Sequence, residues 1–318
     1  MDRQRRHLLQ AALAGALGAA LPGLATARPD MTRTMGTTLA DRGSAFYHFQ
    51  DLRLSSMDRQ RHYRVWIAEP KRPAPAGGHP ALFMLDGNAV ISRLRETWLG
   101  QIQDGTPPVL VMIGYDTDLL FNGAARQYDY TPAAPGEHEI HDPRRADRRG
   151  GGAARFLEWI DTTLTPRVAT LAPINPARAS LWGHSYGGLF TLFALCTRPA
   201  AFHQYFPTSP SLWWAGGLIN LYLKALAAHA PTPPAEVWLC RGNEEGRRTD
   251  DLDEQQWAAA KRRANRDFNR FAGRLDQVPA LRVRHRLYDG QGHGGMFSAS
   301  LPETLRLAAG LPPALDWH

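Results

Sequence analysis

A serine lies between two glycines in the pattern Gly-x-Ser-x-Gly, at Gly183, Ser185 and Gly187. A short apolar run precedes this pattern and an amphipathic stretch follows it to about Cys196, which predicts a strand, a tight turn and a helix. On so sharp a turn the serine hydroxyl group is held clear of the sheet, and the backbone N–H of Tyr186 points toward it as one donor of an oxyanion hole. An ordinary glycine-rich turn is the alternative. The spacing favours a nucleophile and therefore predicts a serine hydrolase.

A base is needed next, because a serine hydroxyl group is a poor nucleophile until its proton is removed. Proteins with this turn carry the nucleophile, the acid and the histidine in that order along the chain. His293 lies in the glycine-rich segment 289–297, after the last expected strand, where an imidazole ring can approach Ser185. A histidine in an ordinary turn is the alternative. The position of His293 favours the role of general base.

The acid that orients this histidine is expected after the strand that ends at Cys240. Glu245 is the preferred candidate and Glu244 the second, while three aspartates are less favoured: Asp250, Asp251 and Asp289. Either glutamate is also compatible with a solvated loop charge. A Ser–His pair that works without an acid therefore stays open.

A second oxyanion donor is expected from the loop after the third strand. Gly87 and Asn88 follow the apolar run 81–85 and fit this position. Asn88 is equally compatible with capping the helix that follows. The sequence predicts a donor at Gly87 or Asn88, opposite the amide of Tyr186.

Another cluster carries metal-ligand residue types, in the segment 137–142 with His138 and His141. The two histidines are one residue too close for the pattern His-Glu-x-x-His, and the flanking residues show no helical period that would align the imidazole rings. This segment is predicted to be a solvated loop. No metal and no other cofactor is expected.

The elements that must position these residues alternate along the chain. Continuous apolar runs at 81–85 and 109–113 are typical of strands buried on both faces, whereas the alternating runs 46–55 and 63–68 suit an antiparallel edge. Other strands are expected at 202–206, 236–240 and 281–287. Helices are expected at 90–102, 153–169, 186–196, 218–228, 252–275 and 296–309. This alternation implies a mostly parallel sheet with helices on both faces, and with the serine turn it predicts an α/β-hydrolase fold.

One long segment, from about 114 to 152, shows no convincing periodicity and is rich in proline, glycine and arginine. A stretch this long without elements inside a compact domain is usually functional. It is predicted to be a loop near the active site, acting as a lid or a binding loop.

The chain has 318 residues, a formal net charge of +7 and two cysteines, Cys196 and Cys240. The positive excess is too diffuse to indicate a nucleic-acid partner, and it is equally compatible with attraction of an anionic small molecule and with a charge that only keeps the protein in solution. Both cysteines lie in apolar element interiors, where free thiols are commoner than a disulfide. We predict two free thiols.

The N-terminal residues 1–27 have the composition of an export signal. Arg5 and Arg6 precede an apolar run that ends in a small-residue cleavage site, a pattern that resembles the twin-arginine signal. We expect residues 28–318 to form one domain in the periplasm, with no stable membrane anchor.

Four motifs together resemble those of the siderophore esterases, the enterobactin-type trilactone esterases within the esterase D-like group. They lie at 83–88, 183–190, 209–214 and 292–300. The last is the most specific, because general esterases rarely follow the histidine with Gly-x-Met-Phe-x-Ala-Ser. The chain resembles the single-domain periplasmic members.

This resemblance implies hydrolysis of the tri-serine lactone backbone of a catecholate siderophore, free or ferric, by Ser185 and His293. In some relatives these two residues are described as a dyad. Arg126 and Tyr130 lie in a segment that resembles the loop bordering the substrate cleft, and the arginine would attract an anionic substrate. Catechol rings would stack on three aromatic side chains, Trp213, Trp214 and Phe297. Core packing is the alternative for at least one of the tryptophans.

Two other functions stay open. One is a general carboxylesterase or thioesterase on the same fold, and the other is a siderophore-binding protein without turnover. The intact pairing of Ser185 with His293 argues against the second.

Overall fold

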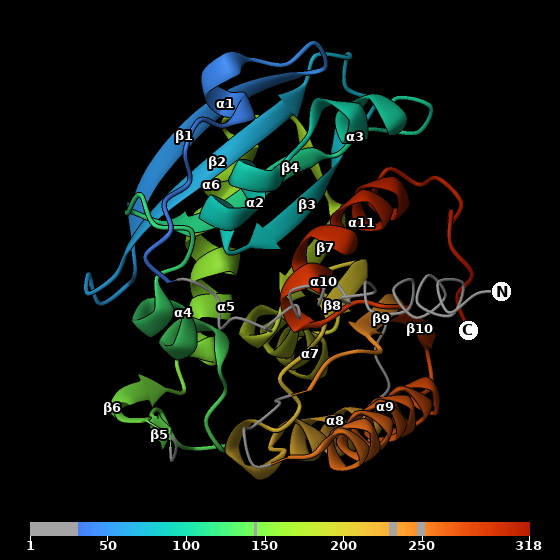
Figure 1. Ribbon diagram of the computed structural model, residues 1–318. Helices are drawn as coiled ribbons and strands as arrows, with labels where there is room; N and C mark the ends of the chain where they lie inside the picture. Colours follow the sequence, from blue (N-terminus) through green and yellow to red (C-terminus); the bar gives the residue numbers. More distant parts are fainter. Residues whose placement is uncertain (1–30, 143–144, 229–233, 247–251) are drawn as a thin grey trace, which may run out of the picture.

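The computed structural model describes residues 31–142, 145–228, 234–246 and 252–318 (Figure 1). The expected signal peptide, 1–27, lies outside the described residues, as do Asp250 and Asp251. Within the described ranges, no helix is both long enough and apolar enough to cross a membrane.

An eight-stranded sheet forms the centre of the molecule, in the order β1-β2-β4-β3-β7-β8-β9-β10. Its strands are β1 (Tyr47–Ser55), β2 (His62–Pro70), β3 (His79–Leu85), β4 (Val109–Tyr115), β7 (Ile174–His184), β8 (Gln204–Thr208), β9 (Ala235–Gly242) and β10 (Leu281–Tyr288). The pairs β1–β2 and β2–β4 are antiparallel and all the others are parallel, which confirms the expected antiparallel edge. The α/β-hydrolase fold predicted from the alternation is the fold observed.

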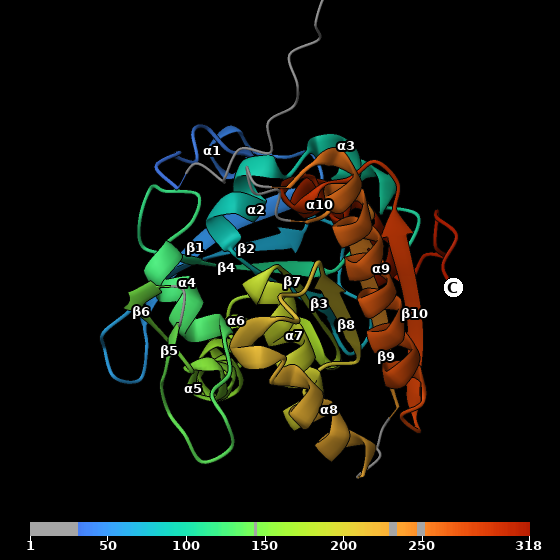
Figure 2. The same ribbon diagram turned by 60° about the horizontal axis from the view of Figure 1, so that its bottom comes forward.

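Helices cover both faces of the sheet (Figure 2). They are α1 (Leu39–Arg42), α2 (Gly87–Arg93), α3 (Glu96–Gln101), α4 (Gly123–Tyr130), α5 (Ala153–Trp159), α6 (Thr165–Ala169), α7 (Tyr186–Thr197), α8 (Ile219–Ala227), α9 (Glu254–Asp276), α10 (His293–Ala299) and α11 (Leu301–Ala308). A π-helical turn at Ile160–Leu164 joins α5 to α6, so the expected helix 153–169 is continuous.

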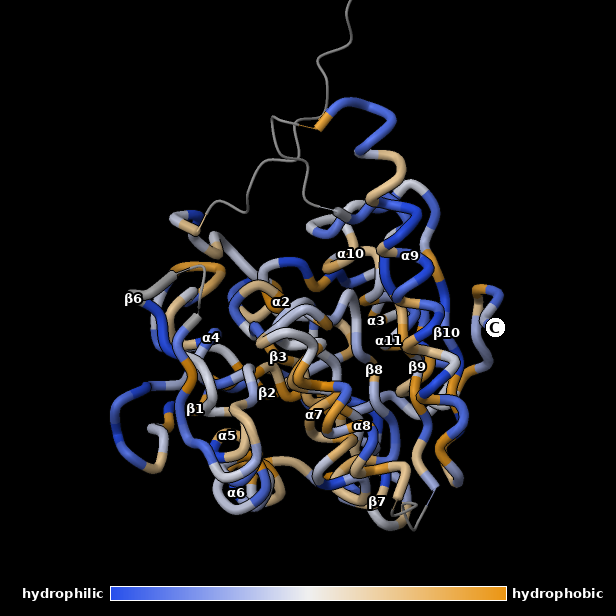
Figure 3. The backbone as a smooth tube through the Cα atoms, turned by 90° about the horizontal axis from the view of Figure 1, so that it is seen from below, coloured by the Kyte–Doolittle hydropathy of each residue, from blue (hydrophilic) through white to orange (hydrophobic). Residues whose placement is uncertain are grey.

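The core has two halves because side chains alternate along each strand. Phe83 and Leu85 of β3 face the cluster that α5, α7, α8 and α9 cover, whereas Leu82 and Met84 face α2, α3 and α11. All seven residues of β3 are buried, as the apolar run predicted. The hydropathy pattern agrees, with α7 mostly hydrophobic and α9 mostly hydrophilic (Figure 3).

Two expected helices are each divided in the structure. The segment 90–102 forms α2 and α3, because Leu94 and Arg95 adopt extended backbone angles and Leu94 turns into the core. The segment 296–309 forms α10 and α11, with Pro302 in the first turn of α11. Proline lacks the N–H that would continue the hydrogen bonds of α10.

The prediction of a long loop at about 114–152 was wrong, because this segment contains α4 and a hairpin of β5 (Ile140–Asp142) and β6 (Arg145–Gly150). The helix had no apolar period because its buried residues are polar or amphipathic, namely Gln127, Asp129 and Tyr130. In the metal-ligand segment, residues 137–139 follow a turn at 135–136 and lead into β5, which takes up 140–142, and Glu139 pairs with Arg149.

Candidate active site

The nucleophile candidate occupies a strained turn between β7 and α7. Ser185 has φ 63° and ψ −115°, a conformation that costs energy for any residue with a Cβ. A Cβ on Gly183 would lie 2.3 Å from the carbonyl oxygen of Gly187, and one on Gly188 would lie 2.6 Å from that of Thr208. The close approach of strand and helix therefore requires glycine at 183 and 188, whereas the space at Gly187 is less tight.

The structure brings together the three side chains that the sequence analysis assigned to catalysis. His293 Nε2 lies 3.0 Å from Ser185 Oγ, and His293 Nδ1 lies 2.9 Å from Glu245 Oε2. Ser185 and Glu245 follow the carboxyl ends of the parallel strands β7 and β9, and His293 begins α10 after β10. This is the geometry in which an imidazole can accept the serine proton while a carboxylate holds its other nitrogen.

Glu245 is buried and fully hydrogen-bonded. Its Oε1 accepts from the Gly242 amide at 2.7 Å and from the Ser209 hydroxyl group, and its Oε2 bonds to His293. Burial by itself would raise the pKa of this carboxyl group, but the hydrogen bond and charge of His293, with the charge of Arg241, lower the pKa to about 2. The group is therefore a carboxylate at neutral pH.

The other acid candidates face elsewhere. Glu244 is exposed and pairs with Lys261, and Asp289 is exposed and accepts a hydrogen bond from Asn243 at 2.9 Å. Among the described acids, the carboxyl group hydrogen-bonded to His293 is that of Glu245.

The sequence analysis did not predict the residues that support the three catalytic side chains. His184 is buried, and its Nε2 donates to the backbone oxygen of His293 at 2.8 Å. Burial, reinforced by repulsion from His293, holds the pKa of His184 well below its usual range, so this ring is a neutral donor. Ser209 supports Glu245, and Ser211 Oγ lies 3.5 Å from Ser185 Oγ. Both serines belong to the motif at 209–214, for which the prediction concerned only the tryptophans.

The predicted oxyanion donors lie at two adjacent helix starts. Tyr186 is the first residue of α7 and Gly87 the first of α2, and the first amides of a helix have no acceptor within it. A Cβ on Gly187 would lie 3.8 Å from Asp86 Oδ2, which places the two turns side by side. The capping role considered for Asn88 was wrong, because its side chain bonds instead to the backbone of Tyr115 and Thr117.

Most of the residues implied to contact substrate are not available for it. Tyr130 is fully buried, Phe297 is 3% exposed, and Trp214 is 2% exposed and donates to the carbonyl oxygen of Pro132. Their rings fill the core, so the expectation that Trp214 and Phe297 stack on catechols was wrong. Trp213, which is 45% exposed and packs beside Tyr186, is the aromatic side chain of this set that reaches solvent.

Arg126 is also differently placed from the expectation. Its guanidinium group makes two hydrogen bonds to the Asp86 carboxylate, Nε to Oδ1 and Nη2 to Oδ2, both 2.8 Å long. The side chains of Arg126 and Asp86 are 11% and 1% exposed. Its positive charge is thus neutralised by Asp86 rather than presented to an anionic substrate.

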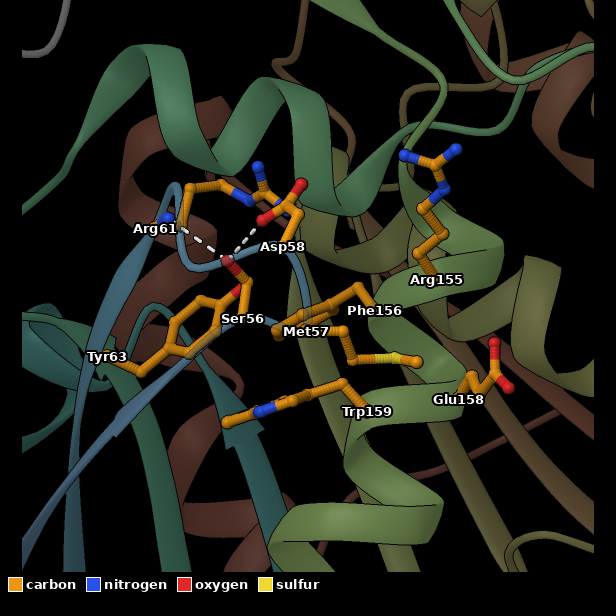
Figure 4. Close-up of a pocket in the computed structure, with 9 residues that line it drawn as sticks. All are labelled: Ser56, Met57, Asp58, Arg61, Tyr63, Arg155, Phe156, Glu158 and Trp159. Carbon is orange, nitrogen blue, oxygen red and sulfur yellow. Dashed lines mark hydrogen bonds and ion pairs between the residues drawn. The ribbon is translucent and has the colours of Figure 1, made fainter.

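Two cavities lie away from this arrangement. One, of about 290 Å³, lies between the β1–β2 turn and α5, with Met57, Arg61 and Trp159 in its lining (Figure 4). The other, of about 480 Å³, lies between the end of β10 and α11, beside Glu303. Neither is lined by Ser185 or His293, so neither is the reaction site.

Comparison with known proteins agrees with this geometry. Residues 55–306 match the model of the Esterase family, described as "Putative esterase". The apo-salmochelin esterase of Escherichia coli O6:H1 is 46% identical over 186 residues, which are 58% of this chain and 58% of that protein. Ferri-bacillibactin esterase BesA of Bacillus subtilis is 29% identical over 80% of this chain and 87% of its own. The solved structure of the enterobactin and salmochelin hydrolase IroE is 35% identical, with a TM-score of 0.65 over 86% of this chain and 99% of that one.

Proposed function

The chain belongs to the Esterase family, and on that premise we propose that it is a serine esterase that hydrolyses the tri-serine lactone backbone of a catecholate siderophore. The observation that carries the catalytic part is the hydrogen-bonded series Ser185–His293–Glu245, with distances of 3.0 and 2.9 Å. The substrate part is supported by the relatives, which are esterases of salmochelin and ferri-bacillibactin.

The reaction is acyl transfer to water in two steps. Ser185 Oγ attacks a lactone carbonyl carbon while His293 Nε2 takes its proton, and Glu245 stabilises the resulting imidazolium. Amide groups of Tyr186 and of Gly87 or Asn88 stabilise the oxyanion. His293 then protonates the departing serine oxygen of the substrate, which leaves an acyl-enzyme. A water molecule, deprotonated by His293, attacks that ester, and the proton returns to Ser185 as the carboxylic acid leaves.

The physiological effect follows from the chemistry of the ligand. A cyclic backbone holds three catechol groups ready for one iron ion, and opening the ring removes this preorganisation. Hydrolysis therefore weakens the hold on iron. Trp213 offers an exposed aromatic surface, beside Tyr186 of the nucleophile turn, on which one catechol ring can stack.

The substrate assignment predicts a strong preference for the trilactone. Purified protein is assayed with an iron-free tri-catechol trilactone, its ferric complex and short-chain nitrophenyl esters, and products are separated by chromatography. We expect kcat/KM for at least one trilactone form to exceed that for the simple esters by about 100-fold or more, because remote binding energy is used at the transition state. A preference for the simple esters would mean a general carboxylesterase.

The variant Trp213→Ala serves as the specificity control in the same assay. Loss of one stacking contact is expected to raise KM for the trilactone by about 10-fold, and to change nitrophenyl acetate hydrolysis by less than about 2-fold. Equal effects on both substrates would show that Trp213 does not contact the catechol.

We further propose that the protein works in the periplasm, a location supported by the signal-like pattern in 1–27. The mature protein is then expected to begin at Arg28 after export. N-terminal sequencing of protein recovered from the periplasmic fraction tests this, and an intact Met1 in the cytoplasmic fraction would contradict it.

A further inference from the structure

Two residues with strained backbones lie at the ends of neighbouring strands. Asp86 follows β3 with φ 55°, and Ser185 follows β7 with φ 63°. β3 and β7 are paired in parallel, with Met84 opposite Trp182. Left-handed backbone is costly for residues that have a Cβ, and it persists where surrounding contacts hold it in place. A candidate oxyanion donor comes directly after each strained residue.

One guanidinium group joins these two turns. Besides its two 2.8 Å bonds to the Asp86 carboxylate, Arg126 Nη2 lies 3.4 Å from the carbonyl oxygen of His184, the residue before Ser185. The guanidinium group also lies 5.5 Å from the ring of Tyr186. Arg126 belongs to α4, which is part of neither turn. It therefore contacts both turns from outside.

Asp86 is held on its other sides as well. Its amide donates to the Tyr130 hydroxyl group at 3.1 Å, and its carbonyl oxygen accepts from the amides of Ala89 and Val90. The next residue, Gly87, has no room for a side chain, because a Cβ there would lie 2.5 Å from the carbonyl group of Met112. Both the backbone and the side chain of Asp86 are thus held by neighbouring residues.

We propose that Arg126 and Asp86 are positioning residues, which hold the amides of Gly87 or Asn88 and of Tyr186 convergent on one oxyanion. This role rests on the proposed function. The planar guanidinium group makes two parallel hydrogen bonds and so fixes the orientation of the carboxylate as well as its distance. A lysine ammonium group cannot do this. Loss of one charge from a buried ion pair leaves the other unpaired and destabilises the fold, so Arg126→Lys, which keeps the charge, separates a positioning role from a loss of stability better than Asp86→Asn does.

The same helix supplies a matched control. Asp129, three residues after Arg126, is buried and accepts from Arg61 Nε at 2.7 Å and from the hydroxyl groups of Tyr63 and Tyr115. This second ion pair also fixes α4 to the sheet, but its arginine lies at the cavity of Figure 4 and contacts neither turn. Arg61→Lys and Arg126→Lys therefore weaken two different anchors of α4 by the same substitution, with different consequences for the donors.

The experiment compares wild type, Arg126→Lys, Asp86→Asn and Arg61→Lys. The measured quantities are kcat and KM for a nitrophenyl ester, the rate of inactivation by diisopropyl fluorophosphate, and Tm. We expect Arg126→Lys and Asp86→Asn to lower both kcat and the inactivation rate about 100-fold, with KM within about 3-fold, as when one oxyanion donor is lost. Arg61→Lys is expected to keep both rates within about 3-fold of wild type at a similar loss of Tm.

Three results would overturn this role. Parallel losses of rate in Arg126→Lys and Arg61→Lys, in proportion to Tm, would mean that both pairs only stabilise α4. If a folded Arg126→Lys protein kept the wild-type kcat and inactivation rate, the oxyanion donors would not need Arg126 to position them. A wild-type protein that does not react with diisopropyl fluorophosphate would overturn the proposed nucleophile itself, and this role with it.

Discussion

Replacing Ser185 with alanine is expected to lower kcat for ester hydrolysis by about a million-fold, because no other group can form the acyl-enzyme. The neighbouring elements keep their places, since the alanine adopts the same turn and leaves His293 bonded to Glu245. Trilactone binding should persist, with Kd within about 3-fold of the wild-type value. Hydrolysis is followed by chromatography, and binding by tryptophan fluorescence.

Ser211→Ala is the matched control, because its hydroxyl oxygen lies 3.5 Å from that of Ser185. This variant should keep kcat within about 10-fold of wild type, since His293 bonds to Ser185 and not to Ser211 in the described contacts. It should also still react with diisopropyl fluorophosphate. If the Ser185→Ala protein still reacted with diisopropyl fluorophosphate, a different residue would be the nucleophile.

Glu245→Gln is expected to lower kcat by about 10⁴-fold with little change in KM. The reason lies in the donors around the carboxyl group. The Gly242 amide can only donate, so it selects the amide oxygen of a glutamine for the position of Oε1. The glutamine NH₂ group then faces His293 Nδ1, which becomes an acceptor and leaves the proton on Nε2. In that tautomer the imidazole cannot accept the proton of Ser185.

Glu244→Gln provides the comparison, because this adjacent side chain is exposed and pairs with Lys261. It is expected to keep kcat within about 2-fold, as for most surface charges. The pair of variants also decides between a triad and a dyad. If Glu245→Gln kept kcat within about 10-fold of wild type, the acid would contribute only to structure, and Ser185 and His293 would suffice.

Strand and helix positions near the site were largely predictable, because their patterns are local. β3 and β4 are continuous apolar runs, and the matched family confirms the resemblance drawn from four short motifs. The helix α4 was not predictable in this way. It is anchored by Asp129 to Arg61, which is 68 residues away, and by Arg126 to Asp86, 40 residues away. An ion pair leaves no periodic signal in the segment that carries it.

The exposure of the aromatic residues could not be predicted from the sequence either. Trp213 and Trp214 are adjacent and identical in type, yet one is 45% and the other 2% exposed. Nothing in their order distinguishes them, since Trp214 packs in the core and donates a hydrogen bond to the carbonyl oxygen of Pro132, contacts made with segments distant in the sequence. The position of Glu245 in the sequence made it the preferred acid but left Glu244 open, and donors from Gly242, Ser209 and His293 decide between the two.

The amino-acid sequence alone determined the strained serine turn, the order of nucleophile, acid and base, and the class of fold. These features depend on backbone geometry and periodicity over a few residues, which neighbours in the chain set. Tertiary structure decided whether the preferred acid, Glu245, meets the imidazole, which tryptophan faces solvent and where the charge of Arg126 goes. Each of these outcomes depends on contacts between residues that lie 36 to 82 positions apart in the chain, and local propensities carry no information about such contacts.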